Sequence, residues 1–214
     1  MSTQEGIIRS VYDNQIDCIR AIQQLYLLDG LWLDATYSKG IFYRGQDFEP
    51  LMRMDIAPQD SDTIQADSTD IPLPDESVAS VMFDPPFVLG KANRKEPGII
   101  CTRFGEFKTA EDLWSYYGAS LREFYRILYT DGVLVFKCQD TINSSINYFS
   151  HVWVMNEAVR VGFYPKDLFI LVAKNRLIQH NLKTQQHARK YHSYFWIFVK
   201  EKCKVKYEAG EDME

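Results

Sequence analysis

An apolar run from Val78 to Phe83 leads directly into the tetrapeptide Asp84-Pro85-Pro86-Phe87. A short run of this kind, followed by a turn signal, predicts a buried strand. Proline fixes φ at about −65° and has no N–H, so two prolines in succession predict a rigid turn whose carbonyl groups can still accept hydrogen bonds. Open α/β sheets bind their ligands at the carboxyl ends of the strands. This segment therefore constrains the fold class and the position of a functional site together.

The chemistry of that turn suits one kind of ligand. Asp84 offers a carboxylate and Pro85 offers a carbonyl, so together they can accept both N–H bonds of an amino group. Phe87 adds an aromatic face on which a flat ring can stack. The tetrapeptide is thus suited to a planar heterocycle that carries an exocyclic NH2 group.

These four residues resemble the Asp/Asn/Ser-Pro-Pro-aromatic motif of the amino-methyltransferases, which transfer a methyl group from S-adenosylmethionine to an exocyclic amine of adenine or cytosine in DNA. The resemblance implies that Asp84, Pro85, Pro86 and Phe87 form the catalytic segment and that S-adenosyl-L-methionine is the cofactor. On the family pattern, Asp at the first position favours adenine over cytosine. None of the four cysteines follows a proline, which argues against the Pro-Cys nucleophile of ring-carbon cytosine methyltransferases.

Strand-like and helical patterns alternate along the chain and end in two strands with no helix clearly required between them. Helices are predicted at 14–28, 111–128 and 148–161, and strands at 31–33, 50–54, 63–66, 78–83, 133–136, 168–172 and 194–199. In the third helix, Phe149, Val152, Asn156 and Val159 are expected on one side. This order predicts a three-layer α/β/α fold, with a mostly parallel sheet and an antiparallel edge hairpin. It also resembles the Rossmann-like methyltransferase fold, which has seven strands with the last one reversed.

The first predicted strand runs into the segment from Asp34 to Gly40. This segment resembles the glycine-bearing loop that approaches the methionine part of the cofactor in the methyltransferase family. Small residues suit such a loop because the backbone must come close to the ligand. The resemblance implies cofactor-binding roles for Asp34, Ala35, Thr36, Ser38 and Gly40. Ser38 departs from the pattern, because the family more often has glycine there.

Two further acids follow later strands on the same side of the predicted sheet. Asp55 comes 21 residues after Asp34, close to the spacing of about 20 at which nucleotide-binding α/β folds place an acid for ribose hydroxyls. Asp67 resembles the next family position, an acid near the adenine ring of the cofactor. Asp70 is an alternative for that role.

The charge of the chain is unevenly distributed. The formal net charge is −5, yet residues 174–206 contain nine Lys or Arg and one acid, Glu201. A nucleic acid, with DNA favoured, is therefore expected to meet one face of the protein. The candidate substrate-binding residues lie in the segments 88–109 and 175–193 and are Lys91, Arg94, Lys95, Arg103, Arg176, Lys183, Arg189 and Lys190. No metal is expected, since the histidines at 180, 187 and 192 have no accompanying cysteine or carboxylate cluster.

Residues 1–206 are predicted to form a single methyltransferase domain, and the acidic tail 207–214 is predicted to be disordered. No separate target-recognition domain is evident, so sequence specificity is expected to be loop-borne, absent, or supplied by a partner such as a second copy or an accessory specificity subunit. The scattered cysteines and the lack of an apolar run of roughly 20 residues predict a cytoplasmic protein without a membrane span. The lack of a separate target-recognition domain fits a small enzyme of bacterial or phage-like type.

Three other functions remain open from the sequence. Base amines in RNA present the same chemistry, and Asp-Pro-Pro-aromatic occurs in RNA methyltransferases too. A glutamine side chain of a protein is a further acceptor, although the basic carboxyl-terminal region argues against it. A catalytically silent nucleic-acid-binding subunit with the same fold would explain Ser38, whereas the intact segment from Asp84 to Phe87 opposes it.

Overall fold

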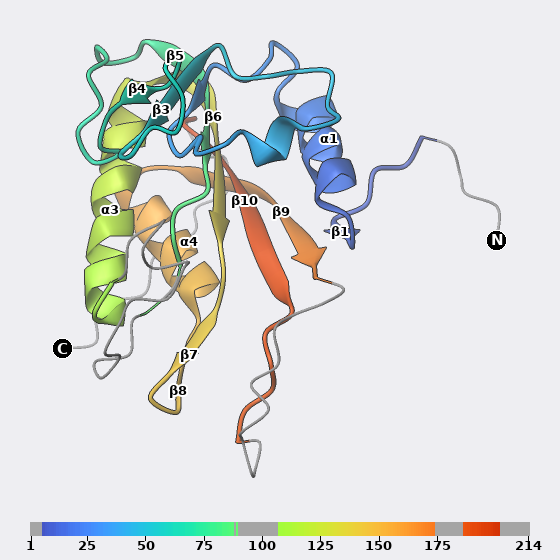
Figure 1. The fold of residues 1–214 in the computed structure, drawn as a ribbon, viewed down its shortest axis with the longest axis vertical. Coiled ribbons are helices and arrows are strands. Elements are labelled where there is room, and N and C mark those ends of the chain that lie inside the picture. Colours follow the sequence, from blue (N-terminus) through green and yellow to red (C-terminus); the bar gives the residue numbers. More distant parts are fainter. Residues whose placement is uncertain (1–5, 88, 90–106, 174–185, 202–214) are drawn as a thin grey trace.

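The computed structural model describes residues 6–87, 89, 107–173 and 186–201 (Figure 1). Its main feature is an eight-stranded sheet in the order β1-β9-β10-β6-β5-β2-β3-β4. The strands of this sheet are β1 (Val11–Tyr12), β2 (Leu33–Asp34), β3 (Met52–Asp55), β4 (Ile64–Gln65), β5 (Val78–Phe83), β6 (Leu128–Cys138), β9 (Tyr164–Val172) and β10 (His192–Val199). A second, two-stranded sheet is formed by β7 (Thr141–Asn143) and β8 (Ile146–Tyr148).

Helices cover both faces of the large sheet, as Figure 1 shows. The helices are α1 (Gln15–Tyr26), α3 (Ala110–Ile127) and α4 (Ser150–Val161), and Ile41–Tyr43 forms a short 3-10 turn, η1. Ile19 and Ile22 of α1 pack against one face with Met82 and Val135 of the central strands. The side chains of α3 and α4 pack on the opposite face with Phe83. The three-layer arrangement predicted from the sequence is therefore confirmed.

Local chemistry explains where these helices begin and end. The side chain of Asn14 accepts a hydrogen bond from the N–H of Ile16 at the start of α1, and Thr109 and Asp112 form a capping box at the start of α3. Such caps satisfy backbone donors that have no partner inside the helix. Gly162 ends α4 with φ of 118°, a conformation that glycine adopts without steric cost.

The sheet is parallel except at β10, which pairs antiparallel with both β6 and β9. This arrangement confirms the predicted hairpin and the reversed last strand. The sheet has one strand more than predicted, because Val11 and Tyr12 pair in parallel with Ile170 and Leu171 of β9. The strand β5 lies between β2 and β6, with parallel pairing on both sides.

Two features of the structure were not predicted from the sequence. The buried residues of α4 are Ser150, Val154 and Ala158, whereas Phe149 and Val152, which were expected on one side with Asn156 and Val159, are exposed. The β7–β8 hairpin was not predicted at all. Its turn residues, Ser144 and Ser145, both have positive φ, of 49° and 63°.

Some predictions stay untested. The acidic tail 207–214 lies outside the described residues, and the assignment of 1–206 to one domain remains a prediction. Among the helices that the structure describes, none has the length and apolar character to cross a membrane.

Candidate active site

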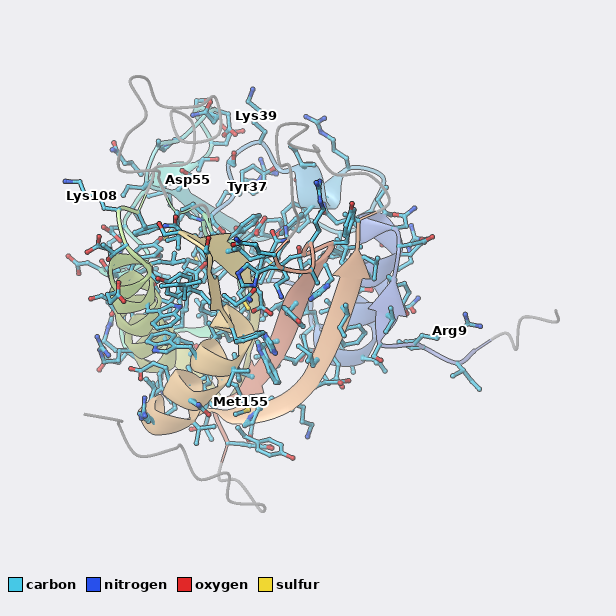
Figure 2. The ribbon with its side chains drawn as sticks, turned by 90° about the horizontal axis from the view of Figure 1, so that it is seen from below. Arg9, Tyr37, Lys39, Asp55, Lys108 and Met155 are labelled. Carbon is cyan, nitrogen blue, oxygen red and sulfur yellow. The ribbon has the colours of Figure 1, made fainter. Side chains whose placement is uncertain are left out.

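The carboxyl ends of the parallel strands surround a cavity of about 640 Å³. Asp34 ends β2, Asp55 ends β3, Asp67 follows β4, and Asp84 follows β5. All four carboxylates line this cavity. In Figure 2, Tyr37 and Lys39 of the loop after β2 lie near Asp55 at one end of the molecule, whereas Met155 of α4 lies at the other end. The strand-end acids predicted from the sequence are thus brought together.

Asp34 is the most buried of these acids, with 2% of its surface exposed. Its Oδ2 accepts a hydrogen bond of 2.6 Å from the hydroxyl of Tyr43, and its Oδ1 accepts one of 2.8 Å from the N–H of Thr36. Burial raises the pKa of the Asp34 carboxyl to about 7, and the nearby carboxylates of Asp84 and Asp55 add to the rise. The two hydrogen bonds act in the opposite direction. Near neutral pH, this group therefore changes its charge easily.

The loop after β2 joins the acids to one another. The N–H of Ser38 donates a hydrogen bond of 2.8 Å to Oδ2 of Asp55, and the N–H of Asp84 donates one of 2.7 Å to Oγ1 of Thr36. Ser38 has φ of 52° and Gly40 has φ of 59°. The loop therefore takes the left-handed conformation that favours glycine at both positions, even though one of them is serine. Ala35, Thr36 and Ser38 line the cavity, whereas Gly40 shapes the turn without lining it.

The next two acids are held by their own turns. Oδ1 of Asp55 accepts from the N–H of Ala57 at 2.8 Å, and Oδ1 of Asp67 accepts from the N–H of Thr69 at 2.9 Å. Asp70 is absent from the described lining of the cavity. The geometry therefore favours Asp67 over Asp70 as the third acid of the site.

Asp84 differs from the other three because a cation contacts it. The Nζ of Lys137 lies 3.0 Å from its Oδ2. Its other oxygen, Oδ1, is buried and has no hydrogen-bond partner among the residues that the structure describes. Asp84 and Pro86 line the cavity, and the hydroxyl of Tyr117 donates to the carbonyl of Pro86 at 3.2 Å. Asp84 thus has one oxygen that is paired and one that has no partner among the described residues.

Not every predicted residue reaches the cavity. Pro85 is buried and Phe87 is partly buried, and neither belongs to the described lining. Of the eight candidate substrate-binding residues, Arg189 and Lys190 are described, and both precede β10. The other six lie outside the described residues: Lys91, Arg94, Lys95, Arg103, Arg176 and Lys183.

Sequence reasoning missed several residues of the site. Lys137 follows the apolar run of β6, so the rule that selected the strand-end acids could have found it. Tyr43 could not be found this way, since its bond to Asp34 depends on the turn η1. Further lining residues that were not predicted are Gln15, Tyr37, Phe42, Phe107 and Tyr116.

The sequence of the chain matches the model of a known protein family. Residues 78–213, more than half of the chain, match the N6/N4 methyltransferase family described as DNA methylase. The chain belongs to this family. The match confirms the resemblance drawn from Asp84 to Phe87, and with it the expected cofactor of that family, S-adenosyl-L-methionine. No protein of curated function matches the sequence.

Several solved structures resemble the chain at low sequence identity. The 1,6-didemethyltoxoflavin-N1-methyltransferase of Burkholderia thailandensis, solved with S-adenosylhomocysteine, has 11% identity and a TM-score of 0.56 over 89% of this chain and 80% of that one. TTHA0409 of Thermus thermophilus, described as a putative DNA modification methylase, has 16% identity and a TM-score of 0.47 over 72% of this chain. The cytosine-N4-specific PvuII DNA methyltransferase has 19% identity and a TM-score of 0.48 over 63% of this chain. The present chain covers 56% of TTHA0409 and 47% of the PvuII enzyme. The first of these likenesses supports the Rossmann-like methyltransferase fold.

Proposed function

We propose that this protein transfers a methyl group from S-adenosyl-L-methionine to the exocyclic amine of a nucleobase, and that the base is adenine in DNA. The observation that carries the proposal is the buried, unpartnered Oδ1 of Asp84, among the described residues, in a cavity shared with three other strand-end acids. The volume of about 640 Å³ lies within the range of roughly 300 to 1,000 Å³ that is usual for small-molecule sites. The choice of adenine follows the family pattern of Asp at the first position of the tetrapeptide.

The cavity residues fit a nucleoside cofactor with a cationic centre. Asp55 and Asp67 offer carboxylates to hydroxyl and amino donors. Tyr37, Phe42 and Tyr116 contribute aromatic surface for a flat ring. When bound, the cofactor would supply an electrophilic methyl group attached to sulfur. In this proposal Asp34, with the loop that follows it, holds the cofactor at the end of β2.

The protein's part in the reaction is to orient the acceptor. The lone pair of an adenine amine is delocalised into the ring, so the amine is a poor nucleophile. Oδ1 of Asp84 accepts one N–H and the carbonyl of Pro85 accepts the other, which favours a pyramidal nitrogen and aims its lone pair at the methyl group. The carboxylate of Asp84 also stabilises the positive charge that develops on the nitrogen. No covalent intermediate with the protein is required.

The nucleic acid is proposed to approach along the β7–β8 hairpin and the segment before β10. Figure 1 shows this hairpin projecting away from the large sheet. Asn147 and His187 are joined by a hydrogen bond of 2.9 Å between Nδ2 and Nδ1, which ties the two segments together. Arg189 is exposed, and the Nζ of Lys190 lies 5.3 Å from the ring centre of Phe149. These cations suit phosphate contacts, which position a nucleic acid without reading its sequence.

The test is methyl transfer from labelled S-adenosyl-L-methionine to duplex DNA, single-stranded DNA and single-stranded RNA, followed by mass spectrometry of the nucleosides. We expect N6-methyladenine in DNA. N4-methylcytosine would reassign the base, and label in RNA alone would reassign the polymer. A protein that neither binds millimolar cofactor in calorimetry nor methylates any of the three acceptors would contradict the proposal.

A further inference from the structure

The register of β5 against β6 places Lys137 directly beside Asp84, the proposed catalytic acid. In the parallel pair β5–β6, Val81 faces Leu134, Met82 faces Val135 and Phe83 faces Phe136. One residue further along each strand are Asp84 and Lys137. Their side chains meet at 3.0 Å between Oδ2 and Nζ. The contact therefore follows from the pairing of two central strands.

Lys137 is almost inaccessible to solvent. Lys137 is 8% exposed, and its Nζ lies 4.8 Å from the ring centre of Phe42 and 5.6 Å from that of Phe195. Aromatic faces attract a cation, but a buried ammonium also needs an anionic partner. Among the described residues, Asp84 is the one that forms an ion pair with it.

This pairing gives the two oxygens of Asp84 different partners. Oδ2 is occupied by Lys137, whereas Oδ1 is buried and has no partner among the described residues. A carboxylate with one anchored oxygen cannot rotate freely, so the other oxygen keeps a fixed direction.

We infer that Lys137 is a positioning residue, which anchors Oδ2 of Asp84 so that Oδ1 is presented to the amine of the acceptor base. This inference rests on the function proposed above, since it assigns Asp84 to the acceptor. Lys137 acts through Asp84 and transfers no proton. A purely structural ion pair would predict a loss of stability on mutation, but no selective loss of kcat at unchanged cofactor affinity.

The kinetic test compares Lys137→Met and Lys137→Arg with the wild-type protein. For Lys137→Met we expect kcat to fall at least 30-fold, while the dissociation constant of the cofactor stays within threefold. Lys137→Arg keeps the cation and should recover most of the lost turnover. Lys166→Met, which removes a half-exposed lysine 3.8 Å from Glu201, is the matched control and should leave kcat and cofactor affinity unchanged.

A second measurement needs no turnover. A crystal structure of Lys137→Met, or of Lys137→Gln if the Met variant does not fold, should show Oδ1 of Asp84 turned away from its wild-type direction. A carboxylate that keeps the wild-type orientation overturns the inference, even for a protein that methylates nothing. An unchanged kcat of Lys137→Met in a protein that does methylate DNA overturns the inference and leaves the proposed function intact.

Discussion

The ends of β2 and β5 carry the same residue after the same kind of strand, yet their surroundings differ. Asp34 is almost fully buried and is contacted by neutral donors, a hydroxyl and a backbone N–H. Asp84 is partly exposed, with 26% of its side chain accessible, and is contacted by the ammonium of Lys137. Burial without a cation raises the pKa of Asp34 to about 7. Two carboxylates in one cavity thus differ in their burial and in the charge of the groups that contact them.

In the proposed function, Asp34 belongs to the cofactor end of the cavity and Asp84 to the acceptor end. Changes at one strand end should therefore alter cofactor affinity, and changes at the other should alter turnover.

Replacing Asp84 by Ala should have the largest effect. Loss of the carboxylate removes both the acceptor for the amine and the anion that stabilises its developing charge, so kcat should fall by roughly 1,000-fold or more, equivalent to about 4 kcal/mol. The dissociation constant of S-adenosyl-L-methionine should change less than threefold. Steady-state methyl transfer and calorimetry measure the two quantities. Asp29→Ala, an exposed acid outside the cavity, is the control, and turnover of Asp84→Ala within tenfold of wild type would defeat the assignment.

Gly40→Ala should disturb the other strand end. Gly40 has φ of 59°, and an added Cβ would meet the ring of Tyr37, at 2.6 Å from its Cζ. That ring stacks on Tyr43 and lies under the guanidinium of Arg53. It cannot move without shifting Tyr43, whose hydroxyl contacts Asp34. We expect a loss of about 1 to 3 kcal/mol in the free energy of unfolding.

The same variant separates the two ends of the cavity. Cofactor affinity should weaken in Gly40→Ala, while kcat at saturating cofactor stays within threefold of wild type. Urea unfolding, calorimetry and methyl transfer measure the three quantities. A drop in kcat as large as that of Asp84→Ala would mean that the loop after β2 and the end of β5 act as one unit.

The third prediction concerns pH. Below pH 7 the carboxyl of Asp34 is protonated in the free protein, since its pKa is raised to about 7. A cationic ligand favours the ionised form, so binding at lower pH must first release a proton. The dissociation constant of S-adenosyl-L-methionine should therefore rise roughly tenfold between pH 7.5 and pH 5.5. Calorimetry at several pH values checks this, and Asp34→Asn should bind more weakly at pH 7.5 and lose the pH dependence.

The stability of the free protein should respond in a related way. The folded-state pKa of Asp34 lies above the ordinary value of 3.8, so the folded form binds the proton more tightly than the unfolded form does. The contribution of Asp34 to stability is therefore lost as pH rises from about 4 through 7. Asp34→Asn should flatten this part of the profile in urea unfolding. A wild-type profile and an Asn profile of equal slope would contradict the raised pKa.

The sequence predicts features that depend on neighbouring residues better than features that depend on contacts between distant parts of the chain. The strand Val78–Phe83 and the acid that follows it are visible because the apolar run and the two prolines are adjacent in the chain. The partner of Asp84 is 53 residues away, and only the register of β5 against β6 brings it into contact. Long-range pairing of this kind leaves no local pattern.

Two elements were misread for a different reason. The buried face of α4 is made of Ser150, Val154 and Ala158, which include small and polar residues, while the larger Phe149 and Val152 are exposed. Apolar spacing therefore does not identify the buried face of α4. The β7–β8 hairpin turns at Ser144 and Ser145 in place of the glycine-containing pair that usually identifies such a turn.

The smallest effect is expected at Ser38, the residue that departs from the family pattern. Ser38 has φ of 52°, and its N–H donates to Asp55. Glycine adopts this conformation without the steric cost of a Cβ, but it also loses more conformational freedom on folding. These two effects oppose each other, so Ser38→Gly should raise the free energy of unfolding by less than about 1 kcal/mol. Cofactor affinity should be equal or slightly higher, because the backbone N–H that contacts Asp55 is retained. Thermal unfolding and calorimetry test this, and a clear loss of both stability and affinity would show that the serine side chain contributes more to the cofactor loop than its backbone does.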